Sequence, residues 1–154
     1  MNTVRNLFVL YLFSIIFFSS SFLESAVINI EPPSQNRNPG EEITIQIKIR
    51  DVSELFGFQF SLNYDQKILN LIEVTEGEFL NKAGTENTYW VKPDTHTEGM
   101  VKLSACTRIQ SGGVSGEGIL ANIKFKASGG GKSNLILTDT KLVNSSINEI
   151  SHTV

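Results

Sequence analysis

The strongest constraint on the fold is a period-two alternation of side chains in two consecutive segments. In residues 43–50, four isoleucines alternate with four polar residues: Ile43, Ile45, Ile47 and Ile49 against Thr44, Gln46, Lys48 and Arg50. In residues 56–64, an apolar series alternates with a small, polar one: Phe56, Phe58, Phe60, Leu62 and Tyr64 against Gly57, Gln59, Ser61 and Asn63. Because a strand presents successive side chains to opposite faces, each segment predicts a half-buried antiparallel strand.

The rest of the chain from residue 27 onward also favours short strands separated by turns. Further strands are expected at residues 27–31, 68–74, 88–91, 100–107, 119–127, 135–137 and 142–143, with a short last one near 147–150. The Gly- and Ser-rich stretch 110–118 is expected to be a loop, and Phe79 and Leu80 are expected to close one end of the core. Since no segment has a sustained helical stripe, we predict an all-β antiparallel sandwich of about eight strands.

The first 26 residues have the pattern of a secretory signal peptide. A single basic residue, Arg5, precedes an uncharged apolar run over 7–18 and three serines at 19–21. Cleavage is expected after Ser21 or Ala26, which leaves one domain over 27–154 in an extracellular or cell-surface setting. The alternative is an uncleaved N-terminal anchor, and only then would the chain be held in a membrane. The apolar stretch 7–23 is short for that role, since a membrane span needs about 20 residues.

Composition excludes several classes of function. The net charge of −3, from 13 basic and 16 acidic side chains, argues against a nucleic-acid partner. Two His and one Cys argue against a zinc finger, a disulfide scaffold and most His-dependent catalysis. The carboxylates Glu73, Glu76 and Glu78 are interpreted as solvated charges rather than an acid–base pair. We therefore expect no enzyme activity, no catalytic residue and no cofactor or metal.

The lone cysteine leaves two hypotheses open. Cys106 cannot form a disulfide within the chain, since no second cysteine exists. The first hypothesis is a small, partly buried side chain, as free cysteines commonly are. The second is a disulfide between two copies of the chain.

What remains is a binding function at a sheet surface. A small, polar strand face such as that of residues 57–63 suits either a protein partner or stacked sugars. Sugar binding favours exposed aromatic rings, for which Tyr89 and Trp90 are the candidates. Because adjacent strand residues face opposite ways, at most one of them can belong to a platform on a given face. The competing interpretation, favoured for each, is a ring that fills the core.

At this point the sequence resembles the cohesin domain family, whose members bind dockerins in cellulosomes. The segments that carry the resemblance are Pro39-Gly40-Glu41, Asp51 to Phe60 (DVSELFGFQF), Leu62-Asn63-Tyr64-Asp65, Ile68-Leu69, Glu76 to Leu80 (EGEFL), Gly113 to Leu120 (GVSGEGIL), Ile123 to Lys126 (IKFK) and Asp139 to Asn144 (DTKLVN). The resemblance implies a nine-stranded jelly-roll sandwich that binds a dockerin-containing partner noncovalently and catalyses nothing. Carried over by position, the partner-binding candidates are Gly57, Gln59, Ser61, Asn63, Lys102 and Ser104.

The chain departs from the best-known cohesins at two of these positions, since that class places Asn and Asp where Gly57 and Gln59 stand. The leading hypothesis is a secreted, non-catalytic module that joins polysaccharide-degrading or surface assemblies. The alternatives are a carbohydrate-binding module that uses Trp90, and a structural adhesion domain that self-associates through Cys106 or an open C-terminal edge. A glycosidase is the most distant hypothesis.

Overall fold

A computed structural model describes residues 25–81, 87–94, 97–110 and 112–154. The described elements are eight strands, and their bounds are β1 Ala26–Glu31, β2 Glu42–Asn63, β3 Leu69–Glu76, β4 Thr88–Val91, β5 Met100–Arg108, β6 Val114–Ala127, β7 Ile136–Asn144 and β8 His152–Thr153. All pairings between them are antiparallel except that of β1 with β8. Residues 1–24 of the expected signal peptide lie outside the described residues, whereas Ala26, its last expected residue, is described: it begins β1 and is 2% exposed.

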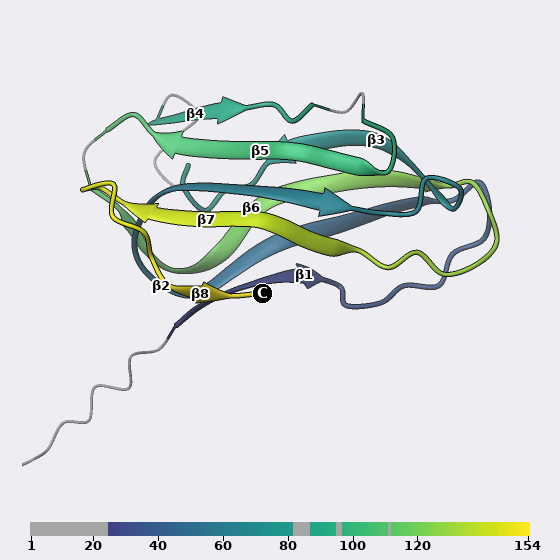
Figure 1. Ribbon diagram of the computed structural model, residues 1–154, viewed down its shortest axis with the longest axis horizontal. Coiled ribbons are helices and arrows are strands. Elements are labelled where there is room, and N and C mark those ends of the chain that lie inside the picture. The colour runs from purple at the N-terminus through teal and green to yellow at the C-terminus, as the bar shows by residue number, and fades with distance from the viewer. Residues whose placement is uncertain (1–24, 82–86, 95–96, 111) are drawn as a thin grey trace, which may run out of the picture.

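The strands form two layers that share β2 (Figure 1). The first half of β2 pairs with β1 and β6, which gives a first sheet in the order β3-β6-β2-β1-β8. The second half of β2 pairs with β5 and β7, which gives a second sheet in the order β4-β5-β2-β7. The predicted all-β sandwich is therefore confirmed.

The core lies between these sheets and uses the alternating side chains of both halves of β2. Ile45, Ile47 and Ile49 are buried from the first sheet, and Phe58, Phe60 and Leu62 are buried from the second. Strand β6 adds the predicted inward series at its 121, 123, 125 and 127 positions. Phe79 and Leu80 are 0% and 1% exposed, which confirms that they close the core.

One prediction was wrong in an informative way, because the two alternating segments are not separate strands. They form one strand of 22 residues that changes sheets without ending. Asp51 and Glu54 have φ of 54° and 55°, and the register with β6 slips on both sides of Val52. These irregularities bend the strand while Val52 and Leu55 stay buried, as β-bulges do.

Residues 114–118 of the Gly-rich segment, which was expected to be a loop, instead begin β6. The glycines of this segment allow the close approach that the bend in β2 requires. A Cβ atom added at Gly113 would lie 2.2 Å from the carbonyl oxygen of Glu54, and Gly116 has φ of 111°. The glycines thus mark a tight strand pairing, which sequence composition does not distinguish from a loop. Strand β7 is likewise continuous through Asp139, whose φ is 51°, where two strands were expected.

Replacement of Gly77 by alanine should destabilise the sandwich at the closed end of the core. A Cβ atom there would lie 2.2 Å from the carbonyl oxygen of Ile119, so the backbone of β6 must move. We expect Gly77→Ala to lower the free energy of unfolding by at least about 2 kcal/mol, as overpacking does. Urea denaturation measures the change.

The matched control is Gly130→Ala, because a Cβ atom at Gly130 meets nothing within 4 Å. Its effect should stay within about 0.5 kcal/mol, as for an ordinary surface substitution. Equal unfolding midpoints for the two variants would contradict the packing described at Gly77.

Candidate functional site

The outer faces of the two sheets differ in their chemistry. On the first sheet, the outward side chains of β2 are polar or charged: Thr44, Gln46, Lys48 and Arg50. The outer face of the second sheet carries exposed apolar side chains from three strands: Tyr89 and Val91 of β4, Leu103 of β5 and Ile136 of β7. Large exposed apolar groups gathered on one face mark an interaction surface, so this face is the candidate site.

Three of the predicted residues of β2 lie on the outer face of the second sheet, as expected. Gly57 lies opposite Val143, and Gln59 and Asn63 are half-buried beside β7. The amide Nε2 of Gln59 donates a hydrogen bond of 3.2 Å to the carbonyl oxygen of Asp139. The amide Nδ2 of Asn63 donates one of 3.2 Å to Oγ1 of Thr138. Both amides are therefore held in place by the neighbouring strand.

The expectation that Ser104 faces outward is wrong, and Ser61, although it alternates with the inward Phe60 and Leu62, is covered, so that both serines are 0% exposed. The reason is a bulge in β5, where the register with β2 shifts between Phe60 and Leu62 and Leu103 has φ of 51°. Two residues of β5, Lys102 and Leu103, then stand opposite Ser61 and cover it. The backbone N–H of Leu103 donates to Oγ of Ser61 at 3.2 Å.

The same bulge reverses the alternation along the rest of β5. Beyond it, Ser104 and Cys106 point into the sandwich, and Ala105 and Thr107 lie on the outer face. Lys102 is exposed and stays a candidate contact. Sequence analysis therefore missed Leu103, because one extra residue in a strand leaves no mark in an alternating pattern.

The adjacent aromatic residues of β4 face opposite ways. Tyr89 is 63% exposed on the outer face. Trp90 packs inward against Phe58, with ring centroids 6.2 Å apart and planes inclined at 52°. The hypothesis of an exposed Trp90 platform is therefore wrong. The core role predicted for Trp90 holds, whereas Tyr89 does not fill the core.

A shallow groove of about 220 Å³ crosses the outer face of the second sheet, and we call it the Gly57 groove. Its lining includes Gly57, Ala105, Tyr89, Val91, Val143 and Lys141, together with the polar residues Gln59 and Thr107. Each of the four strands of this sheet contributes to it.

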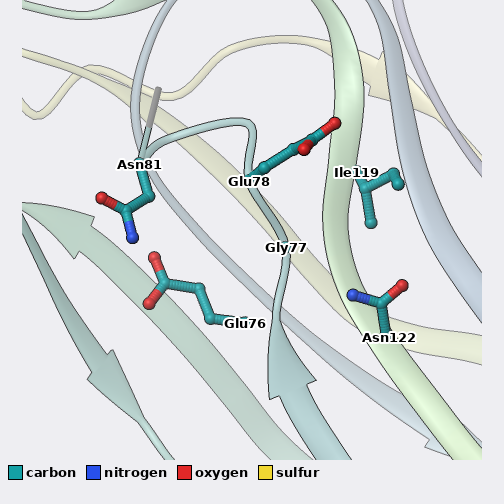
Figure 2. Close-up of a pocket in the computed structure, with 6 residues that line it drawn as sticks. All are labelled: Glu76, Gly77, Glu78, Asn81, Ile119 and Asn122. Atoms are coloured by element: carbon teal, nitrogen blue, oxygen red, sulfur yellow. The ribbon is translucent and has the colours of Figure 1, made fainter. Parts of the chain in front are cut away.

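A second, more polar pocket of about 380 Å³ lies where β3 ends against β6 (Figure 2). Its lining includes Glu76, Glu78, Asn81 and Asn122. Figure 2 shows the side chains of Glu76 and Asn81 directed toward each other, whereas Glu78 points away from them. The two carboxylates do not converge, so the geometry offers no acid–base pair for glycoside hydrolysis.

Glu76 has a structural partner instead. The thiol of Cys106 donates a hydrogen bond of 3.3 Å to Oε1 of Glu76, which links the second sheet to the first. Cys106 is 3% exposed, and burial, together with the nearby Glu76 carboxylate, raises the pKa of its thiol. A buried, protonated thiol is a poor nucleophile, which favours the structural role over a disulfide between chains.

Within 25–81, 87–94, 97–110 and 112–154, no three His, Cys, Asp or Glu side chains gather as metal ligands would. In the same part of the chain, no helix has the length and apolar character needed to cross a membrane.

A sandwich with one charged face and one apolar, grooved face has the architecture of a protein-interaction module. The family model for the cohesin domain matches residues 28–154. The chain therefore belongs to the cohesin domain family, as the sequence resemblance indicated. No curated protein matches the chain.

Solved cohesin structures share the fold at low sequence identity. The second type II cohesin of the ScaA scaffoldin from Acetivibrio cellulolyticus has a TM-score of 0.68 and 18% identity, over 84% of this chain and 85% of that one. CaCohA2 from Clostridium acetobutylicum has a TM-score of 0.67 and 20% identity, over 85% and 86%. The sixth cohesin of scaffoldin B from Acetivibrio cellulolyticus, solved in complex with a dockerin, has a TM-score of 0.65 and 16% identity, over 84% and 94%.

The environment of Cys106 predicts how stability depends on pH. The folded thiol has a raised pKa, so the unfolded chain loses its proton first, near pH 8.5. Above that pH the unfolded state binds fewer protons than the folded state, and stability must fall as pH rises. This group contributes at most about 1.4 kcal/mol of lost stability per pH unit.

Comparison with Cys106→Ala isolates this contribution, because the variant lacks the thiol. Urea denaturation between pH 7 and pH 10 should show a steeper loss of stability for the unmodified chain. In parallel, a thiol reagent at pH 8 should label Cys106 only when the chain unfolds. Rapid labelling of the folded chain would contradict the burial described here.

Proposed function

We propose that this chain is a secreted, non-catalytic cohesin module that binds a dockerin-like partner through the outer face of the second sheet. The observation that carries the proposal is the distribution of exposed apolar side chains. Of the eight large hydrophobic side chains exposed in the described residues, four lie on this face: Tyr89, Val91, Leu103 and Ile136. Burying such groups is the dominant favourable term in protein association.

The choice of a dockerin-like partner is supported by family membership and by the cohesin of scaffoldin B, which was solved in complex with a dockerin. Of the partner-binding candidates predicted from the sequence on β2 and β5, we propose Gly57, Gln59, Asn63 and Lys102 as contacts on this face. Leu103 and Tyr89 join them because of their exposure. Ser61 and Ser104 are excluded as direct contacts by their burial.

The extracellular setting is supported by the pattern of residues 1–26, with a basic start, an apolar middle and small residues at the end. In that setting the module would join enzymes or surface proteins into assemblies that act on polysaccharides.

The direct test is capture by the immobilised full-length chain from the secreted and surface fraction of the source organism. The resemblance implies a partner that needs calcium to fold, so capture is compared in calcium and in EDTA. Calcium-dependent recovery of a protein with a dockerin module would support the proposal. A folded, monomeric bait that recovers no such protein would overturn it.

A second candidate, polysaccharide binding, is favoured by the 63% exposure of Tyr89. It would be supported if the chain were retained on an insoluble polysaccharide and the Tyr89→Ala variant were not. A single exposed ring offers little stacking area, so we rank this candidate below a protein partner.

An acidic substitution on the second sheet should show whether this sheet binds the partner. We expect Leu103→Asp to weaken the dockerin complex by at least about thirtyfold, since it places a charge within the apolar patch. The fold should tolerate the change, because Asp accepts the positive φ of this position better than Leu does. Isothermal titration calorimetry with the captured dockerin measures the affinity.

The matched control is Ile72→Asp on β3 of the first sheet. Ile72 is 47% exposed and Leu103 is 46% exposed, so the two substitutions remove similar apolar surface. Binding by the control should stay within about twofold of the unmodified chain, as expected of a residue outside the interface. An equal loss in both variants would argue against a site on the second sheet.

A further inference from the structure

We propose that the Gly57 groove is an anchor site for one apolar side chain of the partner, and that a carboxylate beside that side chain pairs with Lys141. This inference rests on the proposed function and specifies the chemistry of the partner's docking segment. That segment would carry a leucine-sized or phenyl side chain next to an Asp or Glu.

The size of the groove indicates a side chain rather than a free ligand. Its volume is about 220 Å³. Sites for small molecules usually enclose about 300–1,000 Å³ and bury most of the ligand. A shallow groove of this size on an open sheet face suits one residue that projects from a larger surface, as interface anchors do.

The absence of a side chain at Gly57 opens the groove. A Cβ atom added there would lie 3.2 Å from Cγ2 of Val143 and 3.3 Å from the carbonyl oxygen of Cys106. A single methyl group would therefore occupy the floor. Residues with longer side chains at this position would close the groove, so Gly57 gives this chain a depression in its outer face.

The walls of the groove are mainly apolar. The side chains of Val91 and Ala105 lie on one side and that of Val143 lies on the other. Tyr89 adds a ring that lines the groove and is exposed on the face. An apolar occupant loses water-exposed surface against all of these groups, which is the source of its binding free energy.

The charge at the groove indicates which chemical group lies beside the partner's apolar side chain. Lys141 lines the groove and is exposed, and it forms no ion pair with any described residue. No carboxylate side chain is part of the described lining. In contrast, Lys48 and Arg50 of the first sheet pair with Glu31, and Lys124 pairs with Glu42. An unpaired ammonium beside an apolar groove is complementary to a carboxylate beside an apolar side chain.

Two substitutions test the two parts of the inference with the captured dockerin as the probe. Ala105→Leu fills the groove without a change of charge, and it should weaken the complex by at least about tenfold. Lys141→Glu reverses the charge, and it should weaken the complex by a similar factor that shrinks as salt is added. Lys126→Glu is the control for charge, because Lys126 is exposed on the first sheet. It should leave the affinity unchanged.

A charge exchange then identifies the partner's carboxylate. Replacing the acidic residue of the dockerin's docking segment by Lys should weaken its complex with the unmodified chain and restore binding to the Lys141→Glu variant. Thermal unfolding of each variant checks that the fold is intact. If the dockerin binds the Ala105→Leu and Lys141→Glu chains as tightly as the unmodified one, the anchor inference is overturned, although the proposed function stands.

A small probe tests the groove without any dockerin. We would titrate the full-length chain with 4-phenylbutyrate and, separately, with 4-phenylbutylamine, which has the same ring and the opposite charge. Backbone amide NMR shifts at Gly57, Ala105 and Lys141 should respond to the carboxylate at millimolar concentration and respond much less to the amine. Equal or absent responses would contradict the inferred chemistry. If the chain responds selectively to the carboxylate but captures no dockerin, the inferred chemistry of the groove stands and the proposed function is overturned.

Discussion

The structure depends on one strand that takes part in both layers. Strand β2 pairs with β1 and β6 over its first half and with β5 and β7 over its second. The change of sheet takes place where Asp51 and Glu54 have positive φ, and hydrogen bonding to β6 continues on both sides. Because one strand supplies an isoleucine face and then a phenylalanine face, folding the strand over brings the two halves of the core together. Gly113 allows β6 to follow the bend.

A second irregularity determines what the outer face offers to a partner. The bulge at Leu103 turns Ser104 inward and places Lys102 and Leu103 together above Ser61. Ser61 gains a hydrogen bond from this arrangement, whereas Oγ of Ser104 has no partner among the described residues. A buried hydroxyl without a partner costs about 1–3 kcal/mol. The bulge thus exposes Leu103 on the outer face and leaves the buried hydroxyl of Ser104 without a hydrogen-bond partner among the described residues.

The sequence predicted the parts of the fold that follow from alternation and missed those that follow from irregular backbone. The inward series of β2 and β6, the closure by Phe79 and Leu80 and the opposite directions of Tyr89 and Trp90 were all evident from spacing. The bends at Asp51, Glu54, Leu103 and Asp139 were not, because positive φ at a residue other than glycine has no reliable compositional mark. The candidate site was therefore only partly predictable. The outward positions of Gly57, Gln59 and Asn63 on β2 followed from alternation, but the inward turn of Ser104 and the exposure of Leu103 depend on one inserted residue.

The two outer faces differ in charge pairing and in exposed apolar surface, and this contrast supports the proposed binding on the second sheet. On the first sheet, hydrogen bonds from Lys48, Asn29 and Arg50 lower the pKa of the Glu31 carboxylate to about 2. Side chains that already form ion pairs must give up those pairs and their hydration before they can contact a partner protein. Such a face therefore contributes little net binding free energy. On the second sheet, Lys141 has no such pairing in the described part of the chain, and four large apolar side chains remain in water. A partner that covers this face removes apolar surface from water and pairs a charge that is otherwise unpaired, and both changes favour association.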